Sequence, residues 1–423
     1  MIFCESHLGF DFILSKFMAN YEGGYAMEKV KPARRIKGIE YAIREVVVLA
    51  NQVKATGKEM FYLNIGDPNM FGFEPPRHMV EAVFNAIKQN QNGYSPSNGI
   101  AEAVDAIKRQ AERNGIKNVL EVIVSMGASE GIDLAITGLV NSGDNLLLPY
   151  PSYSLYGAIL GKLEVEANPY YLNEENDWNL DVADIEGRIN DRTKGIVIIN
   201  PNNPTGAVYP KETLLELLDL ARRRNLVIFS DEIYDKLTFD KEFVSIASLA
   251  DDVPVVTFNG LSKSYIVPGW RIGWVIFSGP KDVMADYVEG VNKMARSRLS
   301  ASHPMQWAIK PALDGPQDHI KAMMDILRVR RDLTVKMLNE IPEISCTVPQ
   351  GAFYAFPKLN IPEDDVTFVS DLIRETGVVT VYGSGFGQKP GTQHLRIVFL
   401  PNEQILDKAY TLIRDFVKKR YHN

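Results

Sequence analysis

Short apolar runs alternate with longer amphipathic segments between residues 119 and 280, and this alternation constrains the fold more than any other feature. Short runs rich in Val and Ile are typical of buried strands, and amphipathic segments between them are typical of helices that connect parallel strands. The pattern therefore predicts an α/β fold with a mainly parallel sheet. The clearest helix is residues 210–225, and the predicted strands are residues 121–126, 145–149, 195–200, 226–231, 254–258 and 273–277.

The pattern changes beyond residue 311. A long helical segment at 318–341 is followed by short strands at 352–357 and 394–399. Together with residues 27–73, residues 311–423 are predicted to form a smaller α+β domain, which leaves residues 74–310 as the large domain. Residues 1–26 are interpreted as an N-terminal extension, either disordered or packed, or as the product of an upstream start codon with Met18 or Met27 as the real first residue; the last interpretation is favoured.

The composition argues against several classes of protein. The formal net charge is −7, whereas nucleic-acid binding depends on clustered Lys and Arg. Two cysteines, Cys4 and Cys346, cannot form a disulfide framework or a four-cysteine metal site, and no histidine pair has metal-ligand spacing. Runs of about eighteen apolar residues, which a membrane span needs, do not occur. We expect a cytoplasmic protein without a metal, a nucleic-acid partner or a membrane partner.

Polar residues gather directly after the predicted strands, where open parallel sheets bind their ligands. The four clusters are MGASEG at 126–131, NPNNPTG at 200–206, SDEIYD at 230–235 and NGLSK at 259–263. Because the carboxyl ends of parallel strands meet at one edge of a sheet, these clusters predict one composite site.

Three charged residues of this region call for the same ligand. Lys263 follows a buried strand, and an amine whose pKa is lowered by burial is the nucleophile that a Schiff base needs. Asp231 ends an apolar strand and requires a cationic partner, such as the protonated ring nitrogen of pyridoxal 5′-phosphate (PLP). Arg271 and the glycine-containing turn at 126–131 would bind the phosphate. Taken alone, Lys263 is more typical of a surface lysine, and Arg271 of a residue in a structural ion pair. The combination of Lys263, Asp231, Arg271 and the turn at 126–131 predicts a PLP site.

The motifs NPNNPTG, DEIYD, LSKSYIVPGWRIG and HLRIVFLP, in this order and spacing, resemble those of the class I and II aminotransferases of the fold-type I PLP enzymes. The resemblance runs from about residue 30 to the C-terminus. It implies a large domain with a seven-stranded, mainly parallel sheet between helices, and a smaller α+β domain. The segments LNIGDP, NPNNPTGAVY, EIYDK, FNGLSK and PQGAFYAFPK look most like the alanine aminotransferases of archaea and bacteria.

The resemblance implies roles around the cofactor ring. Lys263 would form the Schiff base with PLP and, once released by the substrate, move the proton. Asp231 would pair with the ring nitrogen, and Asn203 and Tyr234 would both bond the 3-oxygen. Tyr153 would stack on the ring, although packing within the core is an alternative for this tyrosine.

For the phosphate, the matching residues are Arg271, Ala128 and Ser129. Tyr94 matches a tyrosine that reaches the phosphate from the partner subunit, which implies a homodimer with shared active sites. Gly260 departs from the family pattern, because many members have a phosphate-binding serine at this position. This change removes one donor and leaves the rest of the phosphate site intact.

For the substrate, Arg396 matches the arginine that binds the α-carboxylate, since a bidentate guanidinium suits a planar carboxylate. Gly66 and Asn203 are also assigned to the substrate. Arg298 lies six residues before Pro304, as does the arginine that reads a distal carboxylate across the dimer in aspartate aminotransferases; a solvated helix-end arginine is the alternative. Tyr41 is expected to cover the pocket and to favour small side chains.

The resemblance thus implies transfer of the amino group from alanine, or a similar small amino acid, to 2-oxoglutarate by a ping-pong PLP mechanism. Aspartate transamination and C–S β-lysis are the enzymatic alternatives, and Lys263 does not choose among them. A transcription regulator with an aminotransferase-like domain is disfavoured, because residues 1–26 are too short and acidic for a DNA-reading module. An inactive homologue is disfavoured because the catalytic residue types are all present.

Overall fold

The computed structural model describes residues 29–36, 39 and 42–422, and the chain divides into two compact units, residues 1–37 and 38–423. In the first unit the described residues include a short 3-10 helix, η1 (Arg34–Ile36). The N-terminal extension at 1–26 and Tyr41 lie outside the described residues. All elements below belong to the second unit.

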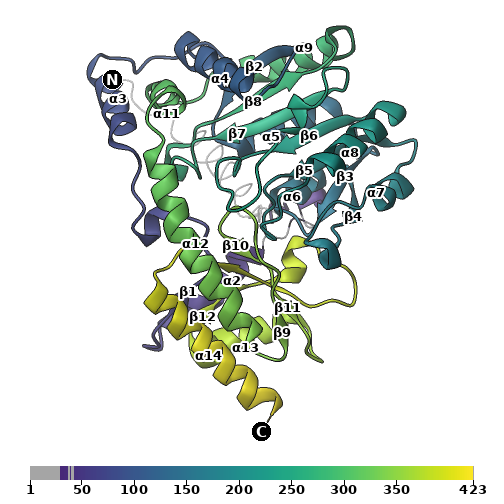
Figure 1. Cartoon of the computed structure of the whole chain (residues 1–423). Helices are drawn as coiled ribbons and strands as arrows, with labels where there is room; N and C mark the ends of the chain where they lie inside the picture. The colour runs from purple at the N-terminus through teal and green to yellow at the C-terminus, as the bar shows by residue number, and fades with distance from the viewer. Residues whose placement is uncertain (1–28, 37–38, 40–41, 423) are drawn as a thin grey trace, which may run out of the picture. The chain divides into compact units, whose positions relative to one another are not determined.

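A seven-stranded sheet with the strand order β2-β8-β7-β6-β5-β3-β4 forms the centre of this unit (Figure 1). Neighbouring strands are parallel, except that β8 is antiparallel to both β2 and β7. The α/β class and the mainly parallel sheet are therefore confirmed. The strands are β2 (Val119–Ser125), β3 (Asn145–Tyr150), β4 (Glu166–Tyr171), β5 (Thr193–Ile199), β6 (Val227–Asp231), β7 (Val255–Gly260) and β8 (Gly273–Ser278).

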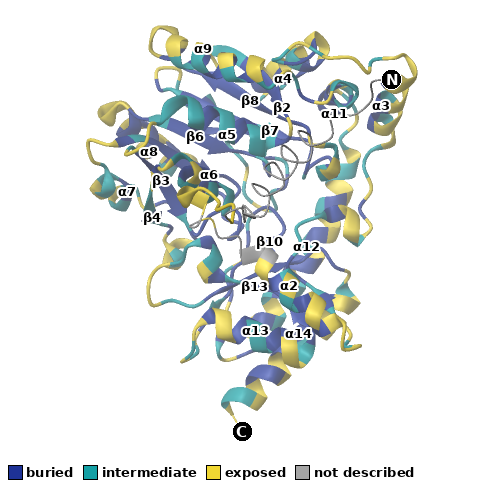
Figure 2. Ribbon diagram, turned by 180° about the vertical axis from the view of Figure 1, so that it is seen from behind, coloured by how far each residue is buried: buried dark blue, intermediate teal, exposed yellow. Residues whose placement is uncertain are grey.

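Helices cover both faces of this sheet. The helices of this region are α3 (Arg77–Lys88), α4 (Ala101–Arg113), α5 (Ala128–Leu139), α6 (Leu155–Leu163), α7 (Val182–Arg188), α8 (Lys211–Arg224), α9 (Lys281–Ser297), α10 (His303–Gln306) and α11 (Ile309–Asp314). Buried residues of α4, α8 and α11 pack on one face, and buried residues of α5, α6 and α9 pack on the other. Figure 2 shows buried strands between helices whose exposed residues face outward.

Apolar residues on both sides of each strand explain this layering. In β5, Ile196 and Ile198 point to the face covered by α4 and α8, whereas Val197 and Ile199 point to the face covered by α5 and α6. Each fully buried Ile or Val side chain contributes about 1.5–3 kcal/mol. A strand that is apolar on both faces is stable only between two layers of helices, as the sequence predicted.

Smaller sheets form around the C-terminal part of the chain. Their orders are β1-β12, β10-β14-β13 and β11-β9, and they pack with long helices. The division into a domain of residues 27–73 and 311–423 and a domain of residues 74–310 stays a prediction. The elements are α2 (Ala42–Lys54), β1 (Phe61–Tyr62), α12 (Asp318–Asn339), β9 (Ile344–Ser345), β10 (Tyr354–Ala355), β11 (Lys358–Leu359), α13 (Asp365–Thr376), β12 (Val378–Val379), β13 (Val381–Tyr382), β14 (Leu395–Val398) and α14 (Glu403–Tyr421).

Each of the six predicted strands of the central sheet corresponds to an observed strand, whereas the residue-based reading missed β4. This strand lies at the edge of the sheet, has mostly partly buried residues and contains Pro169. Proline is tolerated at an edge because one side of the strand has no partner, and the mixed composition hides the strand in the sequence. Among the described residues, no helix combines the length and the apolar character needed to cross a membrane.

Candidate active site

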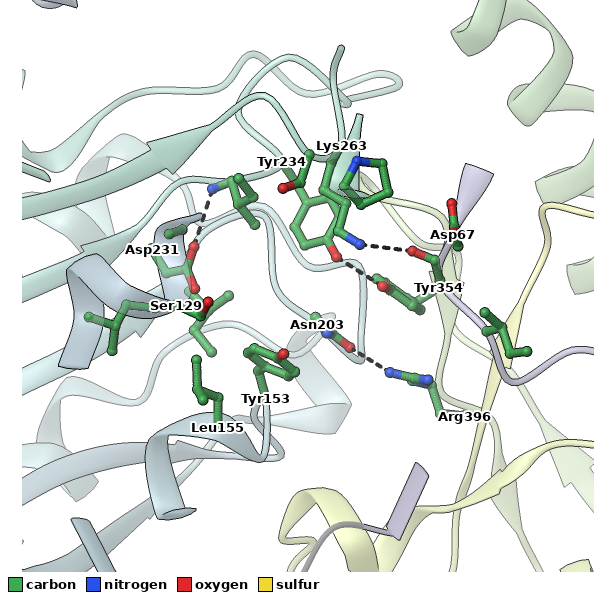
Figure 3. A pocket seen from close by; sticks show the side chains of 18 of the residues that line it. Asp67, Ser129, Tyr153, Leu155, Asn203, Asp231, Tyr234, Lys263, Tyr354 and Arg396 are labelled. Carbon is green, nitrogen blue, oxygen red and sulfur yellow. Dashed lines mark hydrogen bonds between the residues drawn. The ribbon is translucent and has the colours of Figure 1, made fainter. Parts of the chain in front are cut away.

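A cavity of about 320 Å³ lies beyond the carboxyl ends of β5 and β6 and brings most of the expected residues together (Figure 3). In this view Asp231 and Ser129 lie at one side, Arg396 and Tyr354 at the other, and Lys263 and Tyr234 between them. The lining residues are Asn64, Ile65, Gly66, Asp67, Ala128, Ser129, Ile132, Tyr153, Leu155, Ile199, Asn203, Asp231, Ile233, Tyr234, Ser262, Lys263, Pro268, Arg271, Tyr354 and Arg396.

Lys263 lies three residues after the end of β7, in the turn that leads to β8. Its Nζ donates a hydrogen bond to the backbone oxygen of Gly66 at 2.8 Å. Burial lowers the pKa of Lys263 to about 8; the positive charges of Arg396 and Arg271 act in the same direction, and the carboxylate of Asp67 opposes them. An amine with this pKa has a substantial neutral fraction near pH 8, which is the form that attacks a carbonyl.

Asp231 is the last residue of β6 and is 4% exposed. Its carboxylate accepts hydrogen bonds from the backbone N–H of Ile233 at 3.3 Å and from the hydroxyl of Tyr156 at 3.2 Å. Burial raises the pKa of Asp231 to about 6, although both hydrogen bonds and the charge of Lys263 favour the ionised form. A buried carboxylate in this position would be stabilised by a cation in the cavity, and the protonated ring nitrogen of PLP is such a cation.

The turn between β2 and α5 forms an anion-binding type of cradle. Gly127 has φ of 78°, and α5 begins at Ala128 with backbone N–H groups that have no partner within the helix. The Arg271 guanidinium donates to Ser129 Oγ at 2.9 Å and to the Met126 oxygen at 3.3 Å. A Cβ on Gly127 would lie 2.4 Å from Arg271 Nη2, so only glycine permits this approach. The donors and the positive helix end fit a phosphate.

The departure at Gly260 has a steric reason. Gly260 is the last residue of β7, and a Cβ at this position would lie 2.8 Å from the Ile272 oxygen and 2.9 Å from the Cα of Gly273. Both atoms belong to the backbone of the neighbouring β8 segment. A serine at this position would therefore require the two strand ends to move apart.

Arg396 is 2% exposed and projects from β14 toward the cavity. Its guanidinium donates to Asn203 Oδ1 at 3.3 Å and to the Asn64 backbone oxygen at 2.7 Å. The rings of Tyr354 and Phe386 lie 4.9 and 4.6 Å from its central carbon. Two rings and two acceptors fix the plane of the guanidinium, which favours recognition of a planar carboxylate.

The lining also includes residues for which the sequence predicted no role, among them Tyr354 and Asp67. The hydroxyl of Tyr354 is 2.8 Å from the hydroxyl of Tyr234. Asp67 accepts a hydrogen bond from the backbone N–H of Asn69, and its negative charge favours the protonated form of Lys263. Tyr354 lies in the segment GAFYAF, part of the motif PQGAFYAFPK, whose resemblance to the family assigns no role to this tyrosine. The hydrophobic pattern of the sequence alone could have found neither residue, because Tyr354 lies in a strand of two residues and Asp67 lies in a loop.

The remaining expected residues are placed differently. Tyr153 lines the cavity, and its contact with the cofactor ring stays a prediction. Tyr94 is 84% exposed, and it lies outside the lining that the described part of the chain forms. Arg298 also lies outside this lining: its Nη2 donates to the Val124 oxygen at 2.6 Å and its Nε is 3.4 Å from a carboxylate oxygen of Glu130. Both were expected to act across a dimer, so their roles stay predictions.

Comparison with known proteins decides the family. A family model described as aminotransferase class I and II matches residues 58–411. The chain belongs to this family. Its members depend on PLP, so PLP is the cofactor, and the fold is that of the fold-type I enzymes. The lining residues fit this cofactor, because a buried carboxylate, a lysine of lowered pKa and a phosphate-type cradle meet in one cavity.

Similar members of the family include the glutamate-pyruvate aminotransferase AlaA of Escherichia coli K12, which is 38% identical over 94% of this chain and 100% of its own length. The alanine aminotransferase of Mycobacterium tuberculosis is 39% identical over 90% of this chain and 91% of its own length. Among solved structures, the alanine aminotransferase of Pyrococcus furiosus has a TM-score of 0.90 and 42% identity, and the match covers 92% of this chain and all of that chain.

Proposed function

We propose that this aminotransferase moves an amino group from alanine, or a similar small amino acid, to 2-oxoglutarate in two half-reactions. The observation that carries the proposal is the meeting of Lys263, Asp231 and Arg396 in one cavity. The proposal is supported by similarity, over nearly the whole chain, to proteins named alanine or glutamate-pyruvate aminotransferase. The cytoplasmic setting expected from the cysteine count stays a prediction.

When bound, PLP supplies an electron sink for the charge that develops on the substrate Cα. Asp231 would keep a proton on the ring nitrogen, and this pairing would restore the ionised state that burial disfavours. Tyr234 and Asn203 would donate hydrogen bonds to the 3-oxygen. Arg271, with Ser129 and the backbone at Ala128, would hold the phosphate, and Tyr153 would pack against the ring.

Arg396 and Gly66 would position the substrate. The guanidinium would bind the α-carboxylate, with Asn203 beside it, while the backbone at Gly66 closes over the substrate. Lys263 would then carry the proton from Cα, because its lowered pKa lets the amine accept a proton and release it again near neutral pH. The hydrogen bond from Lys263 Nζ to the Gly66 oxygen supports this arrangement, because it brings the amine next to the Gly66 backbone.

We also propose a homodimer with shared active sites, in which Tyr94 of one protomer reaches the phosphate bound by the other. The exposure of Tyr94 is consistent with such a role, and α3 has large exposed apolar side chains at Val80, Phe84 and Ile87 that a partner would cover. Mixing Lys263→Ala protein with Tyr94→Ala protein tests this idea. Random reassociation should restore about a quarter of the wild-type sites, because each hybrid dimer has one intact site; no recovery would contradict shared sites.

Specificity rests on two residues in this proposal. Arg298 would read a distal carboxylate, as glutamate requires, or else serve only to hold Glu130; Tyr41 would cover the pocket and favour small side chains. Aspartate aminotransferases share the fold, since the solved enzyme of Rhizobium meliloti has a TM-score of 0.83 at 28% identity. The identity to that enzyme is lower than the 38–42% identity to the alanine and glutamate-pyruvate aminotransferases, which favours alanine as the amino donor.

A nitrogen-transfer assay tests the proposed function. The purified protein with PLP is incubated with ¹⁵N-labelled L-alanine and 2-oxoglutarate, and the products are analysed by mass spectrometry. We expect labelled glutamate and pyruvate in equal amounts, and no label transfer by Lys263→Ala protein. Formation of pyruvate and free ammonia without labelled glutamate would instead indicate elimination chemistry and contradict the proposal.

A further inference from the structure

Tyr354 contacts residues from both the cofactor side and the substrate side of the cavity. It lies on β10, is 3% exposed and lines the cavity. Its hydroxyl is 2.8 Å from the hydroxyl of Tyr234, and its ring lies under the guanidinium of Arg396. A Cβ on Gly66 would approach the same hydroxyl to 2.3 Å, so the backbone that accepts a hydrogen bond from Lys263 packs directly on Tyr354.

Strand pairing places Tyr354 in this position. β10 is antiparallel to β14, with Tyr354 opposite Val398. Side chains two residues apart on a strand project from the same face, so Arg396 shares a face with Val398 and therefore with Tyr354. The hydroxyl at the tip of the ring then extends past the guanidinium to Tyr234, whose ring meets that of Tyr354 edge-on at 5.7 Å. The position of the Tyr354 hydroxyl is thus set by a sheet and not by a flexible loop.

The direction of the hydrogen bond between the two tyrosines determines what Tyr234 can do. Each phenol has one proton, and the geometry allows either hydroxyl to be the donor. If Tyr234 donates to Tyr354, it has no proton left for an oxygen of the cofactor. If Tyr354 donates to Tyr234, the proton of Tyr234 is available for the 3-oxygen of PLP.

We propose that Tyr354 is a positioning residue that donates its proton to Tyr234 and thereby directs the Tyr234 proton to the 3-oxygen of PLP. The inference rests on the proposed function, which requires Tyr234 to donate to that oxygen. Hydrogen bonds in series polarise one another, so a donor behind Tyr234 strengthens the bond in front of it. Burial raises the pKa of Tyr234 well above its usual value, so this tyrosine keeps its proton.

A pH titration of the visible absorbance of the PLP-bound protein, without substrate, tests the proposal. A weaker hydrogen bond to the 3-oxygen destabilises the negative charge on that oxygen. The proton that the negative 3-oxygen shares is therefore held more tightly and is lost only at a higher pH. We expect Tyr354→Phe to raise the absorbance midpoint by about half a pH unit and Tyr234→Phe to raise it further. In the Tyr234→Phe background, adding Tyr354→Phe should cause no additional rise, because Tyr354 acts through Tyr234.

Matched variants separate this role from general packing. Tyr170→Phe removes a buried hydroxyl that donates a hydrogen bond of 2.7 Å to the Val197 oxygen. Neither residue lines the cavity, so this variant should leave the absorbance midpoint unchanged. Tyr354→Phe keeps the ring under Arg396, so the alanine concentration for half-saturation should change less than about twofold, whereas Tyr354→Leu should raise it about tenfold.

Two results would overturn the inference while leaving the proposed function intact. The first is an unchanged midpoint in Tyr354→Phe protein, which would mean that Tyr234 does not depend on the second hydroxyl. The second is an equal shift from Tyr354→Phe with and without Tyr234, which would mean that Tyr354 acts on the cofactor by another route. If wild-type protein transfers no nitrogen from alanine, the proposed function itself fails, and the inference fails with it.

Discussion

Lys263 donates a hydrogen bond to the backbone oxygen of Gly66, although the two residues are 197 positions apart in the chain. Arg396 donates in the same way to the backbone oxygen of Asn64. The proposed nucleophile and the proposed substrate-binding arginine are therefore both held by one short segment, residues 64–66. A change in the backbone of this segment would disturb both ends of the substrate site at once.

Replacing Lys263 should abolish covalent binding of PLP and most of the activity. We expect Lys263→Ala to lower kcat by about 10⁴-fold or more, because both the nucleophile and the proton carrier are lost. Borohydride reduction followed by peptide mass spectrometry should find PLP on the wild-type peptide that contains Lys263. Lys236→Ala, which changes a partly buried lysine outside the main cavity, should keep the label on Lys263. A label on any other lysine would contradict the assignment.

Asp231 should destabilise the protein when PLP is absent. Its pKa is about 6 in the folded protein against 3.8 for an unperturbed carboxyl, so the folded state binds more protons between these values. Stability therefore falls as the pH rises from about 4 to 6. At about 1.4 kcal/mol per pH unit, the cost at pH 7 is about 3 kcal/mol. We expect Asp231→Asn to raise the free energy of unfolding of the PLP-free protein at pH 7 by up to this amount.

Urea unfolding of PLP-free wild-type and Asp231→Asn protein at several pH values between 4 and 7 measures this difference. The stability gap between the two proteins should widen as the pH rises through that window. Adding PLP should reverse the order, since the ring nitrogen then compensates the carboxylate of Asp231. A gap that does not change with pH would show that the carboxyl is ionised without cost.

Arg271→Lys should weaken binding of the phosphate without affecting recognition of the ring. Nη2 of the arginine donates to Ser129 and to the Met126 oxygen, while Nη1 donates to the Pro268 oxygen, and the single nitrogen of a lysine cannot span these acceptors. Loss of one charge-assisted hydrogen bond predicts a rise of about tenfold or more in the dissociation constant of PLP. Equilibrium titration with pyridoxal, which lacks the phosphate, provides the control ligand. An equal loss of affinity for pyridoxal would point to damage elsewhere.

Gly260→Ser should not improve phosphate binding, even though many family members have a serine at this position. The new Cβ would collide with the Ile272 oxygen and with Gly273, and overpacking of this kind costs about 1–3 kcal/mol. We expect a lower thermal midpoint and no gain in PLP affinity, measured by scanning calorimetry and titration. Tighter PLP binding at an unchanged midpoint would show that the backbone adapts easily.

The sequence predicted the parts of the site that follow from parallel strands. Asp231 ends β6, and Asn203 and Lys263 follow β5 and β7 by a few residues. The carboxyl ends of neighbouring parallel strands lie at the same edge of a sheet, so these residues come close together. The apolar runs of these strands are long enough to identify them as buried strands from the sequence alone. These three residues line one cavity, and their roles stay predictions.

Other parts of the site could not be derived in this way. Tyr354 belongs to a strand of two residues, and Asp67 to a loop, so neither has a periodic pattern that would place it. Their positions depend on how the smaller sheets pack, which involves contacts between residues far apart in the chain. The predicted strand at 352–357 shortens to Tyr354–Ala355 for the same reason, because alternating aromatic residues are apolar in loops as well as in strands.

The central claim is that alanine is an amino donor and that glutamate occupies the same site in the reverse half-reaction. The most direct test is the visible absorbance of the PLP-bound protein, followed in separate stopped-flow experiments after addition of L-alanine, L-glutamate and L-aspartate. We predict that alanine and glutamate both convert the bound cofactor to its amine form and that aspartate does so more slowly. Conversion by aspartate as fast as by alanine would contradict the alanine assignment, and no conversion by any of the three would contradict transamination itself.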